Sequence, residues 1–187
     1  MIGYAFCGSF CTLSDSLGAL RVLSDSGYEI QPIMSEKTYD TDTRFFEKEE
    51  LRSKVRSLTG RHIIHTIKDA EVLGPKMPLS ALIIAPCTGN TLAKLAGGIT
   101  DTAVTMAAKA HLRGDRPLLI ALASNDAMAQ NLGNIGKLLV RKSVYFVPMR
   151  QDDPKKKPHS LVADFSLIGE AFSAMMEGKQ LRPLFLC

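Results

Sequence analysis

Short apolar runs alternate with amphipathic stretches along most of the chain. Runs that are continuous, or rich in β-branched residues, predict strands at residues 2–7, 28–35, 81–86, 117–124 and 143–149. A shorter strand is predicted around Ile63 and Ile64. The run ALIIAP at 81–86 contains no polar side chain, which is typical of a strand buried on both faces in a parallel sheet.

Helices are predicted between these strands, where apolar residues recur every three or four positions. After the first strand, Leu17, Leu20 and Leu23 share one helical face, and Gly27 follows as a C-terminal cap. The other predicted helices cover residues 43–60, a segment from 91, 101 to about 112, 126–142 and roughly 162–176. This alternation predicts a three-layer, doubly wound, Rossmann-like α/β fold with a mostly parallel sheet and helices on both faces.

Length and composition indicate one folded unit. Of its 187 residues, 45% are hydrophobic and 22% are charged, so we expect a single domain over 1–187. Within it, a charged loop at 151–160 precedes a C-terminal helix and tail at 162–187. The lysines at 155–157 either bind an acidic ligand or partner, or are solvated surface charges.

The same features argue against several classes of protein. No apolar run reaches the roughly 18 residues of a membrane span, and the start MIGYAFCGSF indicates a buried strand rather than a signal peptide. We therefore expect a cytoplasmic protein with no membrane partner. The net charge of +4 comes from scattered Lys and Arg residues with few aromatic neighbours, so we expect no nucleic acid partner and a modest attraction for small anions.

The four cysteines, Cys7, Cys11, Cys87 and Cys187, are too irregularly spaced for a disulfide framework, so we expect reduced thiols. Cys7 and Cys11 are spaced like half of a metal site, but no second Cys or His pair follows at ligand spacing. We therefore expect no metal and interpret the pair as small residues around a tight turn.

Polar loops follow four of the predicted strands. The segments after Cys7, Met34, Ala85 and Ala123 are GSFCT, SEKT, PCTGNT and SND, all rich in small hydroxyl or amide side chains. Ligands of open parallel sheets bind outside the carboxyl ends of the strands, near the point where the strand order reverses. These loops therefore predict a ligand pocket.

The first of these loops has the composition of a phosphate-binding turn. Gly8, Ser9, Thr12 and Ser14 precede or begin a predicted helix, whose free N–H groups and dipole favour an anion. Neither G-x-G-x-x-G nor a P-loop motif is present, so the phosphate of a mononucleotide fits better than a pyrophosphate. An ordinary turn with an N-cap serine is the alternative.

The segment after Pro86, which is expected to end its strand, carries two predicted helix starts. Polar side chains at the start of the first helix come from Thr88, Asn90 and Thr91. The glycines at 97–98 end that helix, and Thr100 and Asp101 are expected to cap the next. Two polar caps so close together favour a ligand pocket over simple capping.

The stretch APCTGNTLAKLAGGITDTAV at 85–104 resembles P-A-S-A-N-T-x-x-K-x-A-x-G-I-x-D-N-L of the homo-oligomeric flavin-containing cysteine decarboxylases and their phosphopantothenoylcysteine decarboxylase and flavin prenyltransferase relatives. The shared residues are Pro86, Asn90, Thr91, Lys94, Ala96, Gly98, Ile99 and Asp101. Gly8 and Ser9 resemble the family's flavin phosphate loop, and Ser35 lies where a serine contacts the cofactor. Over about residues 1–149, the resemblance implies a flavoprotein fold, bound FMN and a homo-oligomer, a trimer or dodecamer, with flavin sites at the interfaces between its copies.

The loops and the resemblance together imply one cofactor pocket. Its expected residues are Gly8, Ser9, Thr12, Ser35, Pro86, Cys87, Thr88, Asn90, Thr91, Asp101, Ala123 and Ser124. The chain also departs from the family pattern. Cys87 and Gly89 differ from the family's residues at their positions, and His65 precedes Pro86 by 21 positions, farther than the family's histidine, with DAEVLGPKMP as an insertion. These departures imply a retained pocket without the decarboxylase chemistry.

Two residues are candidates for catalysis. His65 is either a general acid/base, since imidazole titrates near neutrality, or a structural or trimer-interface residue. Asn125, kept in the family's P-A-M-N-x-x-M segment as LASNDAM, is expected to donate to the isoalloxazine or to a substrate carboxylate. Asp101 is expected to contact a flavin and to cap a helix. Further candidates for pairing with substrate carboxylates are Lys37, Arg44 and Lys94, unless these are solvated charges.

A narrower resemblance extends over the whole chain. Its segments are LASNDAMAQNLGNIGKLL, VYFVPMRQDDP, KPHSLVADFSLI and EGKQLRP, which are similar to one component of a two-component dehydrogenase of spore-forming bacteria. This implies dehydrogenation of a reduced pyridine dicarboxylate to the aromatic ring, in the mother-cell cytoplasm during sporulation, with NAD(P) bound by a partner that resembles nicotinamide-dependent dehydrogenases. The alternatives are a flavin-dependent decarboxylase of a cysteine-type substrate and a non-catalytic scaffold for the partner.

Overall fold

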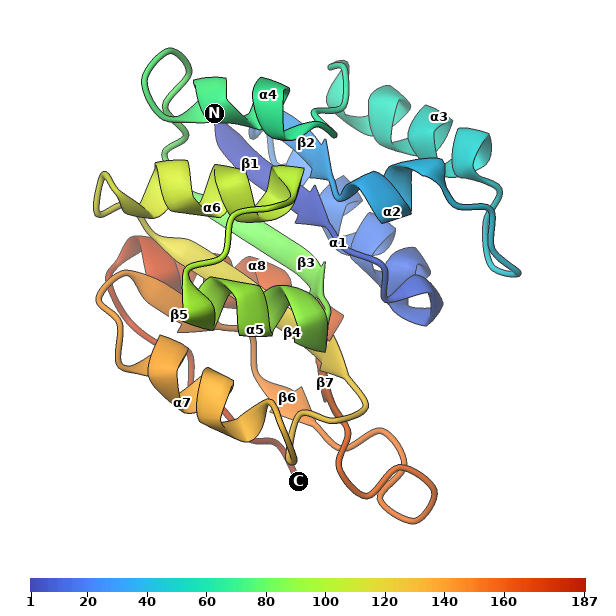
Figure 1. Ribbon diagram of the computed structural model, residues 1–187, viewed down its shortest axis with the longest axis vertical. Helices are drawn as coiled ribbons and strands as arrows, with labels where there is room; N and C mark the ends of the chain where they lie inside the picture. Colours follow the sequence, from blue (N-terminus) through green and yellow to red (C-terminus); the bar gives the residue numbers. More distant parts are fainter.

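The computed structural model describes residues 1–187 and contains one seven-stranded sheet (Figure 1). The strands are β1 (Ile2–Phe6), β2 (Ile30–Met34), β3 (Leu82–Cys87), β4 (Leu118–Ser124), β5 (Val144–Phe146), β6 (Met149–Arg150) and β7 (Leu161–Ala163). The first five are parallel in the order β2-β1-β3-β4-β5, while β7 runs antiparallel to both β4 and β6. This confirms the predicted α/β fold with a mostly parallel sheet.

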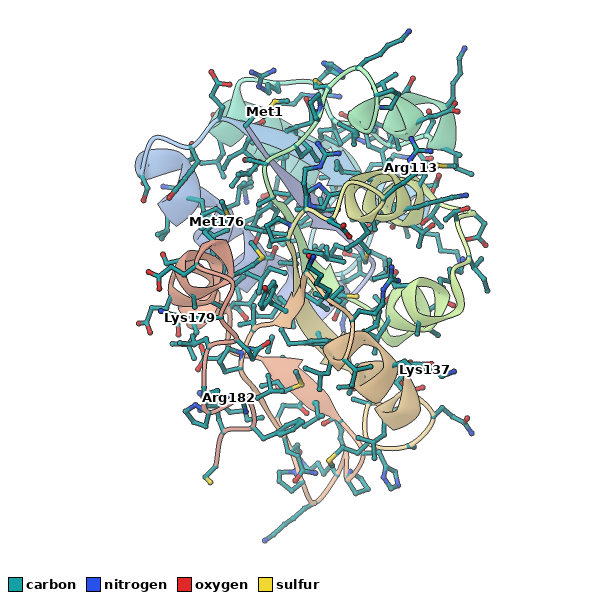
Figure 2. All side chains as sticks on the ribbon, turned by 90° about the vertical axis from the view of Figure 1, so that its left-hand side faces the viewer. Met1, Arg113, Lys137, Met176, Lys179 and Arg182 are labelled. Atoms are coloured by element: carbon teal, nitrogen blue, oxygen red, sulfur yellow. The ribbon has the colours of Figure 1, made fainter.

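Helices cover both faces of the sheet. They are α1 (Leu13–Asp25), α2 (Glu36–Asp40), α3 (Lys48–Thr59), α4 (Ile67–Ala70), α5 (Gly89–Gly97), α6 (Ala103–Leu112), α7 (Leu132–Leu139) and α8 (Ile168–Met176), with 3₁₀ turns at Phe10–Thr12, Glu71–Leu73 and Phe165–Leu167. One hydrophobic core lies beneath α1, α3 and α8, and a second lies beneath α4, α5, α6 and α7. Edge-on, Met176 lies on one side of the sheet, and Arg113 and Lys137 lie on the other (Figure 2).

The central strands are buried along their whole length, as the apolar runs predict. All six residues of β3 and all seven of β4 are buried. The strand β3 continues past Pro86 to Cys87, with a register shift against β4 between Ile84 and Cys87. The expectation that Pro86 ends the strand is therefore wrong. An X-Pro step at a bulge keeps the strand extended although the proline has no N–H to donate.

Two predicted helix starts are wrong. Val162 belongs to β7, and the last helix begins only at Ile168, because Val162 pairs with Ala123 and Arg150 in the sheet. The helix predicted at 126–142 begins at Leu132, since residues 125–131 form turns in which the Asp126 carboxylate accepts hydrogen bonds from Asn131. Such local side-chain bonds compete with helix formation.

Two strand predictions also need correction. The strand predicted around residue 63 is reduced to one bridge between Ile33 and Ile64. The strand predicted at 143–149 is divided into β5 and β6, and Val147 donates its N–H to the carbonyl of Ile120 between them. Pro148 interrupts the pairing because it has no N–H.

None of the helices combines the length and the apolar character that crossing a membrane requires.

His111 on α6 is a buried titratable group whose role is structural. Its Nε2–H donates to the carbonyl of Pro117 at 2.8 Å, while its Nδ1 is buried without a partner. Burial lowers the pKa of His111 from its ordinary 6.5 to about 4, and nearby Arg116 adds to the effect. The folded protein therefore holds the neutral imidazole.

We expect acid to destabilise the fold through His111. Below pH 6.5 the His111 imidazole is protonated in the unfolded chain but stays neutral in the folded chain. The contribution of His111 to the free energy of unfolding is therefore fully present above pH 6.5 and is lost as the pH falls toward about 4. The loss reaches up to about 3 kcal/mol. Urea denaturation of the wild type and of His111→Gln across this range measures it. An identical pH dependence in the two proteins would contradict this role.

Candidate functional site

The carboxyl ends of β1 and β3 form the centre of the candidate site. The order β2-β1-β3-β4 runs outward in opposite directions from these two strands, so the strand order reverses between them. Open α/β sheets bind ligands at such a point. The loops meet there, because the Cys7 N–H donates to the Pro86 carbonyl at 3.1 Å and the Thr91 hydroxyl donates to Cys7 Sγ at 3.3 Å.

The loop after β1 offers unused hydrogen-bond donors. Ser9 N–H donates to the Cys7 carbonyl at 2.9 Å, whereas the N–H groups of Gly8, Phe10 and Cys11 have no acceptor in the chain. The Thr12 hydroxyl donates to the carbonyl and the hydroxyl of Ser9, at 2.9 and 3.2 Å. Ser9 stands at the N-cap position of the 3₁₀ turn Phe10–Thr12, as in the alternative interpretation, but its side chain makes no cap bond. These free amides fit a phosphate group.

The loop after β2 lies beside the first. Ser35 N–H donates to the Phe6 carbonyl at 3.0 Å, and the Ser35 hydroxyl caps α2 by accepting from the Thr38 N–H at 3.3 Å. The next residue, Glu36, accepts from the N–H of Ala103 at 3.0 Å and so joins α2 to the start of α6. This role of Glu36 is not predictable from the sequence, because nothing local connects positions 67 residues apart.

The loop after β3 is ordered by its own hydroxyls. Thr88 caps α5 by accepting from the Thr91 N–H at 3.2 Å, as its position predicts, and Thr88 Oγ1 donates to Thr91 Oγ1 at 3.1 Å. Asn90 is exposed and its side chain has no partner in the chain. Its amide is therefore available to a ligand.

The two cysteines beneath these loops remain neutral thiols. Burial raises the pKa of Cys7 to about 11, although its bond from Thr91 opposes the shift. Burial also raises the pKa of Cys87 well above its ordinary value. A thiolate is the nucleophilic form of cysteine, so the two side chains serve as packing and polar support rather than as nucleophiles.

The loop after β4 contains a network that the sequence analysis missed. Both carboxylate oxygens of Asp126 lie 3.0 Å from Asn131 Nδ2, and one of them also accepts from the Ser124 hydroxyl. The Ser124 bond is the main reason that the pKa of Asp126 lies below its ordinary value. Asn125 sits exposed between these anchored neighbours, and its amide has no partner in the chain. In the sequence, the one sign of this network is Gly89, which stands where the family has alanine and leaves room for neighbouring side chains.

Gly89 makes room for this network. A Cβ at position 89 would lie 2.5 Å from Ser124 Oγ, 2.7 Å from Asn131 Nδ2 and 2.8 Å from Asp126 Oδ1. The start of α5 therefore packs directly against the loop after β4, which brings the third and fourth loops together.

Asp101 does not cap α6 as expected. The cap is Thr102, whose hydroxyl accepts from the Thr105 N–H at 3.2 Å while the Thr105 hydroxyl accepts from the Thr102 N–H. Asp101 instead pairs with Lys94 at 2.8 Å, and this bond lowers the pKa of the Asp101 carboxyl. The pairing occupies Lys94, which was a candidate for substrate carboxylates. The other two candidates, Lys37 and Arg44, are exposed, and Arg44 lies 4.8 Å over the Phe45 ring.

His65 lies at the edge of the site, one residue beyond the bridge that Ile64 makes with β2. Its ring stacks on Tyr39 with a centroid distance of 3.6 Å and an interplanar angle of 8°. The guanidinium of Arg52 lies 3.6 Å from the same Tyr39 ring, and hence on its opposite face. His65 Nδ1 is 3.4 Å from the Ile63 carbonyl. The imidazole is thus held in a fixed plane, and part of it remains exposed.

A cleft of about 800 Å³ adjoins the first loop. It lies between the first turns of α1, at Ser14 and Asp15, and the β6–β7 hairpin, where Arg150 pairs with Asp164. Its first lining residue, Ser14, comes two residues after Thr12, so the cleft lies next to the turn after β1 rather than over the junction of β1 and β3.

Comparison with known proteins gives four relevant matches. The flavoprotein family model matches residues 2–164. The dipicolinate synthase B subunit of Bacillus subtilis (strain 168) is 40% identical over 185 residues, which cover 99% of this chain and 92% of that protein. The crystal structure of the corresponding dipicolinate synthase B subunit from Bacillus halodurans C is 36% identical with a TM-score of 0.91, covering 100% of this chain and 95% of that chain. A dodecameric FMN-dependent Ubix-like decarboxylase from Escherichia coli O157:H7 shares the fold at 18% identity and a TM-score of 0.62, with 79% and 80% of the two chains covered.

We expect Gly89→Ala to destabilise the protein by about 1–3 kcal/mol, because the added methyl group overpacks the Ser124–Asp126–Asn131 network. The matched control is Gly136→Ala in α7, where a Cβ meets nothing within 4 Å. That change should stabilise by about 0.5–1 kcal/mol. Thermal and urea denaturation of both variants measure the difference. Equal effects at the two positions would rule out the packing argument.

Proposed function

The chain belongs to the flavoprotein family, and from this premise we propose that it is an FMN-binding component of a dipicolinate synthase. The reaction is supported by the likeness to the B subunit of a dipicolinate synthase along 99% of the chain. The cofactor is supported by one observation above all. At the turn after β1, several backbone N–H groups have no acceptor, and the Ser9 hydroxyl makes no helix-cap bond. We propose a complex with a nicotinamide partner, the dipicolinate synthase A subunit, which would bind NAD(P).

The turn after β1 would hold the FMN phosphate. The N–H groups of Gly8, Phe10 and Cys11 and the Ser9 hydroxyl would donate to it, and the positive end of the adjacent helix would favour its charge. The remaining expected pocket residues would surround the flavin from the neighbouring loops, namely Thr12, Ser35, Pro86, Cys87, Thr88, Asn90, Thr91, Asp101, Ala123 and Ser124. FMN, when bound, supplies a centre that can accept a hydride.

The protein's own contribution is to orient the substrate and remove a proton. Aromatisation of dihydrodipicolinate releases one hydride, whose final acceptor we assign as NAD(P) on the nicotinamide partner, and one proton, which we assign to the His65 imidazole. The Asn125 amide would donate to a substrate carboxylate. Its place between the anchored Ser124 and Asp126 holds it at the ligand edge of the sheet.

We propose further that the chain forms a homo-oligomer, a trimer or dodecamer, in the mother-cell cytoplasm. The Escherichia coli relative with the same fold is dodecameric. Exposed apolar side chains at the two ends of α7, Leu132 and Val140, supply surface that association would cover.

Ser9→Asp tests the phosphate turn. The added carboxylate faces the phosphate, so FMN affinity should fall by at least about tenfold, whereas riboflavin, which lacks the phosphate, should bind nearly as before. Fluorescence titration of both flavins measures the two affinities. The exposed Ser53→Asp on α3 is the control for added charge. A wild-type chain that binds no FMN, or equal losses for both flavins, would refute the cofactor assignment.

His65→Asn tests the proton acceptor. In the complex with the nicotinamide partner, we expect kcat for dipicolinate formation to fall by about 100-fold or more. Asn125→Ala should mainly raise KM, because it removes a contact to a carboxylate. The matched control is the exposed neighbour His62, as His62→Asn. NAD(P) reduction measures each rate.

Two other outcomes would replace the proposal. Equal turnover by the nicotinamide partner alone and by the complex would reduce the role of this protein to that of a scaffold. Release of carbon dioxide from a cysteine-type substrate, with loss of that activity in His65→Asn, would make it a decarboxylase.

A further inference from the structure

A separate cavity of about 340 Å³ lies in the layer formed by α5, α6 and α7. In Figure 1, α5 and α6 lie on the same face of the sheet, joined by a turn that crosses in front of it. The cavity opens between this turn and the C-terminal half of α6, and its volume suits a small ligand. None of the expected flavin-pocket residues lines this cavity, although Asp101 follows the lining residue Thr100.

Three cations line this cavity and no carboxylate does. Lys109 and Arg113 are four positions apart on α6, and Arg141 follows the end of α7. None of them forms an ion pair within the chain. Asp101 follows the lining residue Thr100, but it is occupied by Lys94. Like charges at positions i and i+4 repel each other, and an anion bound between them would relieve this repulsion.

The helix dipoles account for only part of this charge. The C-terminal ends of α5, α6 and α7 each contribute about −0.5 of a charge, which leaves an excess of roughly +1.5 around the cavity. Cations near helix ends are common for this reason. Here, however, residues from two separate helix ends converge on one cavity, and their surplus matches a small dianion.

The rest of the lining points to an organic ligand. Leu95, Ile99 and Leu112 supply an apolar surface, and half of the Ile99 side chain is exposed. Thr100 adds a hydroxyl and a backbone N–H that have no partner in the chain. A flat apolar body with an anionic group at each end would contact all of these groups at once.

We propose that this cavity binds a small ring dicarboxylate. The two carboxylates pair with the guanidinium groups of Arg113 and Arg141, which can bind them in a bidentate manner, and Lys109 adds a further charge. The choice of a ring dicarboxylate over other dianions rests on the proposed function, whereas the cationic cavity does not. A substrate or product of the same enzyme would thus have a second site, at the opposite end of α5 from the flavin.

Calorimetric titration of the purified chain with pyridine-2,6-dicarboxylate tests this proposal. The Arg113→Gln/Arg141→Gln double variant should bind the probe at least about tenfold more weakly than the wild type. The control is Lys137→Gln, on the same side of the sheet but outside the cavity (Figure 2). Rising salt should weaken wild-type binding. The double variant should keep its FMN affinity. Loss of dicarboxylate binding at the cavity is therefore distinguishable from loss of the flavin site on which the proposed function rests.

Several results would overturn the proposal. Equal affinities of the double variant and Lys137→Gln would show that the cavity cations do not bind the probe. Sulfate that binds as tightly as the dicarboxylate would contradict the assignment of an organic ligand. Equal binding of uncharged pyridine would contradict the role of the carboxylates. A changed oligomeric state of the double variant in light scattering would place the cations in an interface between copies of the chain instead.

Discussion

The junction between the carboxyl ends of β1 and β3 is the constraint on which the rest of the structure depends. Parallel pairing brings both strand ends to one edge, and their crossovers leave in opposite directions. Two buried bonds hold the junction, from Cys7 N–H to the Pro86 carbonyl at 3.1 Å and from the Ser16 hydroxyl of α1 to the Ala85 carbonyl at 2.6 Å. A shift of β3 would therefore move the turn after β1, α1 and the start of α5 together, so the candidate site is as rigid as the core beneath it.

Elements with strong local signals were predictable from the sequence. ALIIAP and PLLIALAS became β3 and β4 because burial on both faces requires continuous apolar residues. The Thr88 cap was predictable because its bond spans only three positions. The hairpin of β6 and β7 was not, since strands of two and three residues show no periodicity and their pairing joins Met149 to Ala163. At residues 126–131 the helical pattern was present, but side-chain bonds of Asp126 prevailed over it.

The candidate site was likewise predictable only in part. That four polar loops share one edge follows from the alternation of strands and helices. Which side chains meet does not, because the partners are separated along the chain, as Glu36 is from Ala103. The pairing of Asp101 with Lys94 shows a further limit. Both residues belong to one motif, yet the motif alone cannot distinguish an ion pair from a helix cap, since Thr102 takes the capping role.

The close approach of Gly89 to the carboxylate of Asp126 also couples two loops that lie far apart in the chain. A Cβ at position 89 would lie 2.8 Å from Asp126 Oδ1, so any side chain at this position requires the carboxylate to move. The residue at the start of α5 and the conformation of the loop after β4 are therefore not independent. Their contributions to stability are expected to be non-additive, as is usual for groups in direct contact.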